Sequence, residues 1–243
     1  MCYPEWSDQE IQNTTKKVFE HFGKTAMRFL RASRMSDEEV LRSVNATGLE
    51  LLDEALAEGK GVLLISAHFG NWERGAHYLA TRGYKVSVVA RDANDAKATE
   101  VVNKKRSQQG VEVFSRGSAA KEILSRLKRN EIVAILPDQN TWEIYVPFFG
   151  KPAGTAVGPA VFHLRTGVPI LGSFCIEMED GSYKGVIQRL DMPELSGDKD
   201  EDVRRITTAI NAMIENVVRM HPEQWLWMHD RWKAARNAGL IEQ

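Results

Sequence analysis

The chain of 243 residues is 43% hydrophobic and 27% charged, close to the averages of globular domains, which excludes collagen-like, coiled-coil and wholly disordered proteins. Its 32 basic and 33 acidic residues give a net charge of −1, so we expect no nucleic-acid partner. Two cysteines, Cys2 and Cys175, are too few for a secreted disulfide framework and favour a reducing, cytoplasmic setting.

The first 58 residues are predicted to form a helical segment that precedes the core or packs on it. Capping boxes predict helix starts at Ser7–Glu10, Ser36–Glu39 and Thr47–Glu50. The first helix has an apolar face, with Phe19 among its residues, flanked by basic ones such as Lys16. This pattern fits either a helix packed on its own domain or one that lies on anionic lipid.

Residues 59–243 are predicted to form an α/β core, and the whole chain one structural domain. Short apolar runs predict strands at 62–65, 85–90, 111–114 and 131–136, and the segments between them predict helices at 71–81, before Gly110 and at 119–128. This alternation indicates a largely parallel central sheet flanked by helices. A hairpin (168–176 with 183–188) and a helix from about 201 to 220 follow.

The apolar stretches of the sequence are short. The longest, Gly61–Ala67 and Gly167–Ile176, fall below the ~18–20 residues that a spanning helix needs. The N-terminal residues lack the basic and apolar regions of a signal peptide. We therefore expect no transmembrane segment, and any membrane contact to be peripheral.

Several common catalytic signatures are absent from the sequence. It contains no G-x-S-x-G, no G-x-x-x-x-G-K-[ST], no G-x-G-x-x-G after the first predicted strand and no Cys/His set with zinc-ligand spacing. We therefore expect neither a cofactor nor a metal.

The segment His68-Phe-Gly-Asn-Trp-Glu73 directly follows the first predicted buried strand. Ligands bind at the carboxyl ends of strands in open α/β sheets, so His68 lies where chemistry is expected. Glu73 falls in the first turn of the next helix, where the helix dipole keeps a carboxylate ionised. A carboxylate bonded to one ring nitrogen orients the histidine as a general base. The alternative is a surface histidine and a glutamate that only caps its helix.

The string Gly61–Glu73 resembles the catalytic motif of the bacterial lipid A biosynthesis acyltransferases, the lauroyl and myristoyl transferases within the lysophospholipid acyltransferase superfamily. Three more segments are similar to family blocks in order and spacing: Leu136–Gln139, Val146–Thr155 and Pro222–Lys233. The resemblance runs from about residue 11 to 233. It implies a glycerol-3-phosphate-acyltransferase-like fold, in which His68 and Glu73 are the catalytic pair.

The resemblance also implies substrate-binding residues. Arg106 matches a family arginine and would hold an anionic group of the acceptor, although its neighbours Lys104 and Lys105 also fit a solvated helix face. Two further groups directly follow predicted strands. Arg91 either adds positive charge to the cleft or lies in a surface turn. Asp138 and Gln139 either line the cleft or cap the next loop.

Two further sets of residues are candidates for substrate contacts. Backbone N–H groups at Gly70 and Asn71 are candidates to bind the oxyanion. Trp142, Phe148 and Phe149 lie in a long segment rich in Pro and Gly, and they either wall an acyl pocket or close the core beneath that segment.

The family's reaction transfers a fatty acyl group to a hydroxyl of a membrane glycolipid such as a lipid A precursor. The resemblance implies acyl-carrier protein, or acyl-CoA, as the donor, and a location at the cytoplasmic face of the inner membrane. The hydroxyl would be activated by His68 and Glu73 without an acyl-enzyme. The alternatives are an acyltransferase for another polar lipid, such as a phosphatidylinositol mannoside or an amino-acid lipid, and a non-catalytic lipid- or carrier-binding protein.

Overall fold

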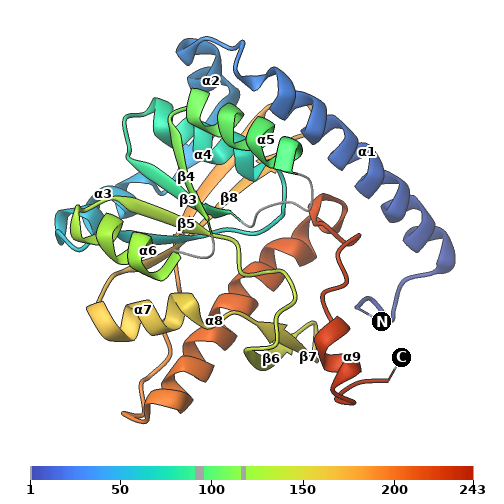
Figure 1. Ribbon diagram of the computed structural model, residues 1–243. Coiled ribbons are helices and arrows are strands. Elements are labelled where there is room, and N and C mark those ends of the chain that lie inside the picture. Colours follow the sequence, from blue (N-terminus) through green and yellow to red (C-terminus); the bar gives the residue numbers. More distant parts are fainter. Residues whose placement is uncertain (1, 91–95, 116–118, 243) are drawn as a thin grey trace.

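A seven-stranded sheet forms the centre of the computed structural model, which describes residues 2–90, 96–115 and 119–242 (Figure 1). Its strands are β1 (Val44–Thr47), β2 (Val62–Ile65), β3 (Val86–Ala90), β4 (Val111–Ser115), β5 (Ile132–Ile135), β8 (Ile170–Glu177) and β9 (Tyr183–Arg189). Their order is β1-β9-β8-β2-β5-β3-β4, and only the β8–β9 pair is antiparallel. The predicted largely parallel sheet and the β8–β9 hairpin are confirmed.

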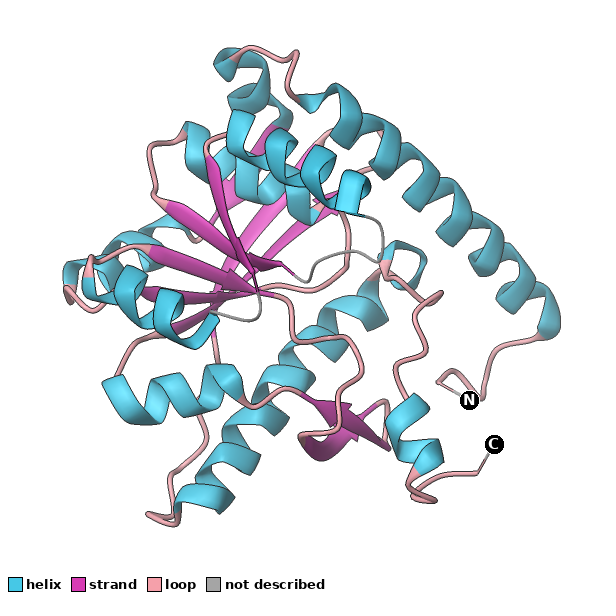
Figure 2. Cartoon of the chain, viewed as in Figure 1, coloured by secondary structure: helices cyan, strands magenta, loops and turns pink. Residues whose placement is uncertain are grey.

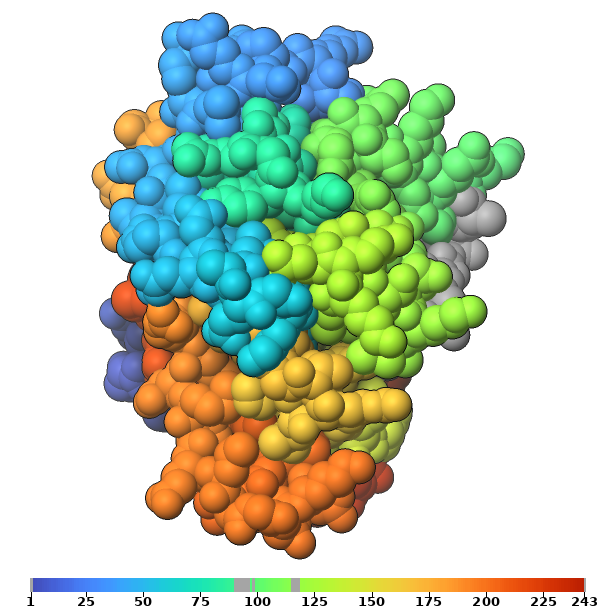
Figure 3. Space-filling model, turned by 90° about the vertical axis from the view of Figure 1, so that its left-hand side faces the viewer, coloured from blue at the N-terminus to red at the C-terminus, as the bar shows by residue number. Residues whose placement is uncertain are grey.

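Helices cover both faces of this sheet (Figure 2). Alternate residues of β2 point to opposite faces, so Leu64 packs with one apolar cluster and Leu63 with the other. The first cluster includes residues of α2 (Asp37–Ser43), α3 (Leu49–Ala57) and α4 (Trp72–Thr81). The second includes residues of α6 (Ala119–Lys128), α7 (Gly158–Thr166) and α8 (Lys199–Met220). Figure 3 shows α7, in yellow, lying against α8, in orange. The elements form a single α/β domain.

The remaining helices lie at the edges of this arrangement. The long helix α1 (Asp8–Ala32) runs along one side and contacts α4 and the short 3-10 helix η2 (Pro222–Gln224) (Figure 1). α5 (Ala96–Gln108) packs beside β4. In the described part of the chain, no helix combines the length and the apolar character needed to cross a bilayer.

The segment at 144–155 forms a hairpin of its own, which the sequence analysis did not predict. β6 (Ile144–Phe148) pairs with β7 (Lys151–Thr155) in an antiparallel two-stranded sheet. The hairpin packs on α8 and on α9 (Lys233–Asn237). Its Pro147 and Pro152 face each other across the pair, and these prolines concealed the strand pattern, because proline is rare inside strands.

Two of the three predicted capping boxes are confirmed. Ser7 and Ser36 each accept the backbone N–H of the glutamate three residues later, and that glutamate returns a hydrogen bond. The third prediction is wrong: Thr47 ends β1, and Gly48 is the N-cap of α3, with φ of +79° and no side-chain cap. Thr47 belongs to β1 because that strand pairs with β9 in the main sheet. The proposed boundary at residue 58 stays a prediction.

Candidate active site

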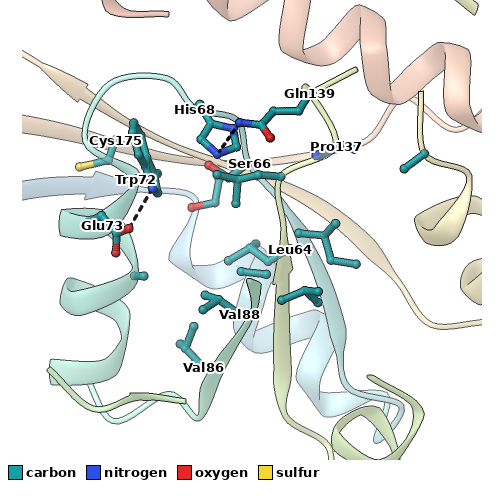
Figure 4. Close-up of a pocket in the computed structure, with 18 of the residues that line it drawn as sticks. Leu64, Ser66, His68, Trp72, Glu73, Val86, Val88, Pro137, Gln139 and Cys175 are labelled. Atoms are coloured by element: carbon teal, nitrogen blue, oxygen red, sulfur yellow. Dashed lines mark hydrogen bonds between the residues drawn. The ribbon is translucent and has the colours of Figure 1, made fainter. Parts of the chain in front are cut away.

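A cavity of about 400 Å³ opens at the carboxyl ends of β2 and β5 and extends beneath α4 (Figure 4). Polar or aromatic side chains surround its entrance: His68, Trp72, Glu73, Arg106, Gln139, Asn140, Thr141 and His229. Mostly apolar ones wall the remainder: Leu64, Ala76, Leu79, Val86, Val88 and Ala134. Leu64 lies in β2 and His68 in the turn that follows it, and both side chains line this cavity.

His68 is held at the entrance by Asp138. The sheet register pairs Ile65 of β2 with Ile135 of β5, and each chain then continues three residues to the two side chains. The ring Nδ1 of His68 lies 2.8 Å from Oδ1 of Asp138, and the backbone N–H of His68 donates to Oδ2, also at 2.8 Å. The indole N–H of Trp225 donates to the same Oδ2 at 3.0 Å. A carboxylate only accepts, so Nδ1 carries the proton and Nε2 keeps its lone pair.

The electrostatics of this pair fit a general base. Burial by itself would raise the pKa of Asp138, but the charge of His68 and the hydrogen bonds from His68 and Trp225 lower it. Burial by itself would lower the pKa of His68, but the charge and hydrogen bond of Asp138 outweigh it and the pKa is raised. The carboxylate therefore stays ionised and makes the imidazole more basic.

We expected from the sequence that Glu73 would bond to the ring of His68. In the structure the ring bonds to Asp138 instead, and Glu73 bonds to Arg106. Its carboxylate accepts hydrogen bonds from Nε and Nη2 of Arg106, the latter at 2.5 Å, and from the indole N–H of Trp72 at 3.1 Å. Glu73 still lies close enough for its charge to raise the pKa of His68. The role of Asp138 was missed because the order of strands in a sheet is not visible in the sequence, and only that order brings β5 next to β2.

The backbone N–H groups of Gly70 and Asn71 are already hydrogen-bonded. Gly70 donates to the carbonyl of Gln224 and Asn71 to that of Cys175, both at 2.8 Å, so neither is free to bind an oxyanion. Gly70 has φ of +58°, and a Cβ there would lie 2.1 Å from the carbonyl oxygen of Cys175. The Asn71 side chain caps α4 and donates to the hydroxyl of Tyr183. These contacts shape the turn that presents His68.

The structure separates the remaining candidates. Gln139 lines the cavity, with its Nε2 3.4 Å from Nε2 of His68 (Figure 4), whereas Arg91 lies outside the described residues. Trp142 is 59% exposed and is not among the lining residues. Phe148 and Phe149 are buried in the cluster on the other face of the sheet, because the β6–β7 hairpin packs on α8. The acyl-pocket interpretation is wrong for these two rings, and the core alternative holds.

The sequence analysis also missed cavity residues. His229 lines the entrance although its segment is about 160 residues from His68 in the chain. The apolar wall could have been found in part, because Leu64 shares the face of His68 by simple alternation. Among the described residues, no group of three His, Cys, Asp or Glu side chains is arranged to hold a metal ion.

The chain is similar in sequence to known proteins of one family. The family model of the bacterial lipid A biosynthesis acyltransferases matches residues 1–234. The chain is 26% identical over 237 residues to a lipid A biosynthesis lauroyltransferase of Escherichia coli, covering 96% of this chain and 76% of the relative. It is 28% identical over 223 residues to a phosphatidylinositol mannoside acyltransferase of Mycobacterium tuberculosis, covering 88% and 69%.

The hydrogen bond between His68 and Asp138 predicts a specific titration. In the wild type, the pKa of His68 lies above its usual ~6.5. Asp138→Asn removes the charge that raises it while burial remains, so the pKa falls. Glu73→Gln lowers it less, because Glu73 acts only through space. NMR titration of the His68 ring protons measures the pKa of His68 in the wild type and in both variants. The same pKa in the wild type and in Asp138→Asn would contradict the pairing.

Proposed function

The chain belongs to the bacterial lipid A biosynthesis acyltransferase family and is an acyltransferase, and we propose that it moves a fatty acyl group from a thioester to a hydroxyl of a membrane glycolipid. The thioester donor is acyl-carrier protein or acyl-CoA. One observation carries the proposal: a histidine oriented by a carboxylate, with its basic Nε2 beside Gln139, at the entrance of an apolar cavity.

The reaction begins with the acceptor hydroxyl at Nε2 of His68. The amide nitrogen of Gln139, 3.4 Å away, marks the position that this hydroxyl takes. An alcohol is a poor nucleophile at neutral pH, so Nε2 removes its proton as the oxygen attacks the thioester carbonyl. Asp138 stabilises the imidazolium that forms. When the C–S bond breaks, the imidazolium returns the proton to the thiolate, which leaves as a thiol, and the ester remains on the acceptor.

The acyl group passes directly to the acceptor without an acyl-enzyme. Cys175 lines the cavity, but burial raises the pKa of its thiol to about 12, so it is neutral and a weak nucleophile. Ser66 also lines the cavity, yet within the described residues no hydrogen bond joins its hydroxyl to His68, as activation would require.

The fatty chain occupies the cavity beneath α4. From Trp72 at the entrance to Leu79 at the far end, α4 rises about 10 Å. Gly75 and Ala76 face the cavity from the middle of the helix, and their small side chains leave the space between α4 and the sheet. This apolar slot replaces Trp142, Phe148 and Phe149 as the acyl site.

The Glu73–Arg106 pair forms the polar edge of the entrance and binds the acceptor headgroup. The side chains of Glu73 and Arg106 are 12% and 18% exposed, so their charges are largely removed from bulk water. Nη1 of Arg106 has no hydrogen-bond partner among the described residues and can bind a phosphate or hydroxyl oxygen of the acceptor. Arg91, after β3, is proposed to add positive charge to the same side.

Helix α1 provides the membrane contact at the cytoplasmic face of the inner membrane. Four apolar side chains are about half exposed along it: Ile11, Phe19, Met27 and Leu30. Exposed Lys16 and Lys24 lie among them, a pattern that suits the surface of anionic lipid. The ring centroids of Phe22 and Trp72 are 6.2 Å apart, and those of Trp72 and His68 are 5.3 Å apart. Aromatic contacts therefore connect α1 with the site.

The acceptor is a lipid A precursor or a related glycolipid. The phosphatidylinositol mannoside acyltransferase of M. tuberculosis, an equally distant relative, favours a second candidate acceptor of that type. Both acceptors carry sugar hydroxyls and phosphate, the groups that His68 and Arg106 are placed to contact.

A transfer assay with purified protein, radiolabelled acyl thioester and each lipid acceptor tests the proposed function. Label should appear in lipid with the wild type. His68→Ala and Asp138→Asn should each lower the rate by ~10²–10⁴-fold, since the first removes the base and the second its orientation. Transfer at the wild-type rate by His68→Ala would rule out this mechanism.

Filling the cavity should change the preferred acyl length. Ala76→Leu places a larger side chain in the slot at a cost of about 1–3 kcal/mol for long chains, a decrease of ~5–150-fold in their transfer relative to shorter ones. Ala120→Leu, on the exposed surface of α6, is the matched control and should leave the profile unchanged. Transfer rates with a series of acyl thioesters of different length measure this preference. The same preference in Ala76→Leu and Ala120→Leu would show that the fatty acyl chain binds outside this cavity.

Removing the apolar residues of α1 should weaken membrane binding. In flotation with vesicles that contain anionic phospholipid, the wild type should rise with the lipid and the double variant Phe19→Ser/Met27→Ser should stay behind. Leu195→Ser, at an exposed apolar position in the loop before α8, is the control and should float like the wild type. Flotation of the double variant to the wild-type extent would contradict the role of α1.

A further inference from the structure

His229 is a second histidine at the entrance of the cavity, and the mechanism above does not use it. It lies in the segment between η2 and α9 that returns to the site from the C-terminal part of the chain. Its Nε2 accepts a hydrogen bond from the backbone N–H of Asn140 at 2.9 Å. It lines the same cavity as His68, and the charges of His68 and Asp138 both act on its pKa.

The hydrogen bond from Asn140 fixes the tautomer of this ring. An N–H donor needs a lone pair on Nε2, so the imidazole is neutral and its proton is on Nδ1. Burial lowers the pKa of His229; the charge of Asp138 opposes this and the charge of His68 adds to it, and the net lowering agrees with a neutral ring. Nδ1 has no hydrogen-bond partner in the described parts of the chain and is not buried, so its N–H is available.

A donor of this kind is what the transfer step lacks. Attack on a thioester carbonyl places negative charge on its oxygen, and this charge needs hydrogen-bond donors already in position. Three backbone N–H groups of the turns around His68 are engaged: Gly70 with Gln224, Asn71 with Cys175 and Asn140 with His229 itself. A neutral imidazole can polarise a carbonyl without adding a positive charge beside His68, which must itself become protonated.

We propose that His229 donates its Nδ1–H to the carbonyl oxygen of the acyl thioester and stabilises the oxyanion of the tetrahedral intermediate. The inference rests on the proposed acyl transfer. As the acceptor oxygen bonds to the carbonyl carbon, the C=O electron pair moves to the oxygen and the Nδ1–H bond holds it there. When the carbonyl re-forms and the C–S bond breaks, the hydrogen bond weakens, and His229 neither gains nor loses a proton.

Three variants test this role with acyl thioester and lipid acceptor. His229→Leu removes the donor and should lower kcat by ~10²–10³-fold. Slow hydrolysis of the thioester by water, measured without acceptor, should fall by a similar factor, because it passes through the same oxyanion. His229→Gln, whose amide can accept from Asn140 and donate to the carbonyl, should recover roughly tenfold of the loss. His221→Gln, outside the cavity, is the control and should retain the wild-type rate.

The outcomes separate the alternatives. An unchanged kcat in His229→Leu, with thermal unfolding like that of the wild type, overturns the proposal. A loss confined to the KM of the lipid acceptor, with thioester hydrolysis unchanged, also overturns it and assigns His229 to acceptor binding. A wild type that hydrolyses the thioester but acylates no lipid contradicts the proposed function, while hydrolysis by the three variants still decides the role of His229.

Discussion

The buried carboxylate of Asp138 is the constraint around which the site is built. It is 2% exposed, and a buried carboxylate without donors is strongly unfavourable. Its three donors come from the turn after β2, which supplies the ring and backbone of His68, and from Trp225 in the C-terminal segment. Two further backbone bonds, from Gly70 to Gln224 and from Leu226 to His68, join the same segments. The energetic need to satisfy one carboxylate therefore also fixes the position of the base.

The second carboxylate of the site has a different task. Glu73 lies in the first turn of α4, where the helix dipole favours negative charge, and its oxygens face Arg106 of α5 instead of the imidazole. The pair joins two helices at the entrance and keeps a nearly neutral polar edge beside the apolar slot. Because Asp138 already orients His68, Glu73 influences the histidine only through its field, and its oxygens hold Arg106 at the rim of the cavity.

Local features of this protein were predictable from its sequence, and non-local ones were not. The buried strand β2, the start of α4 at Asn71 and two capping boxes follow from neighbouring residues, and the structure confirms them. The partner of His68 depends on which strand lies beside β2, and the bond to Asp138 spans 70 residues. Thr47 matched a capping box by composition, yet pairing of β1 with β9 made it a strand residue. The sequence allowed Phe148 and Phe149 to wall an acyl pocket because they are apolar and lie in a segment rich in Pro and Gly. In the structure the β6–β7 hairpin turns them to the other side of the sheet.

β2 and the three residues that follow it carry both part of the apolar wall of the cavity and His68. Leu64, Ser66 and His68 lie at every second position, so they share the face beneath α4, and polarity rises along this row toward the entrance. The catalytic end is tied to Asp138 and the C-terminal segment, whereas the far end is bounded by side chains such as Leu79 and Val86 that take no part in those bonds. A change of volume at the far end leaves the geometry of His68 intact. The side chains that set the volume of the far end are thus separate from those that hold His68 in place.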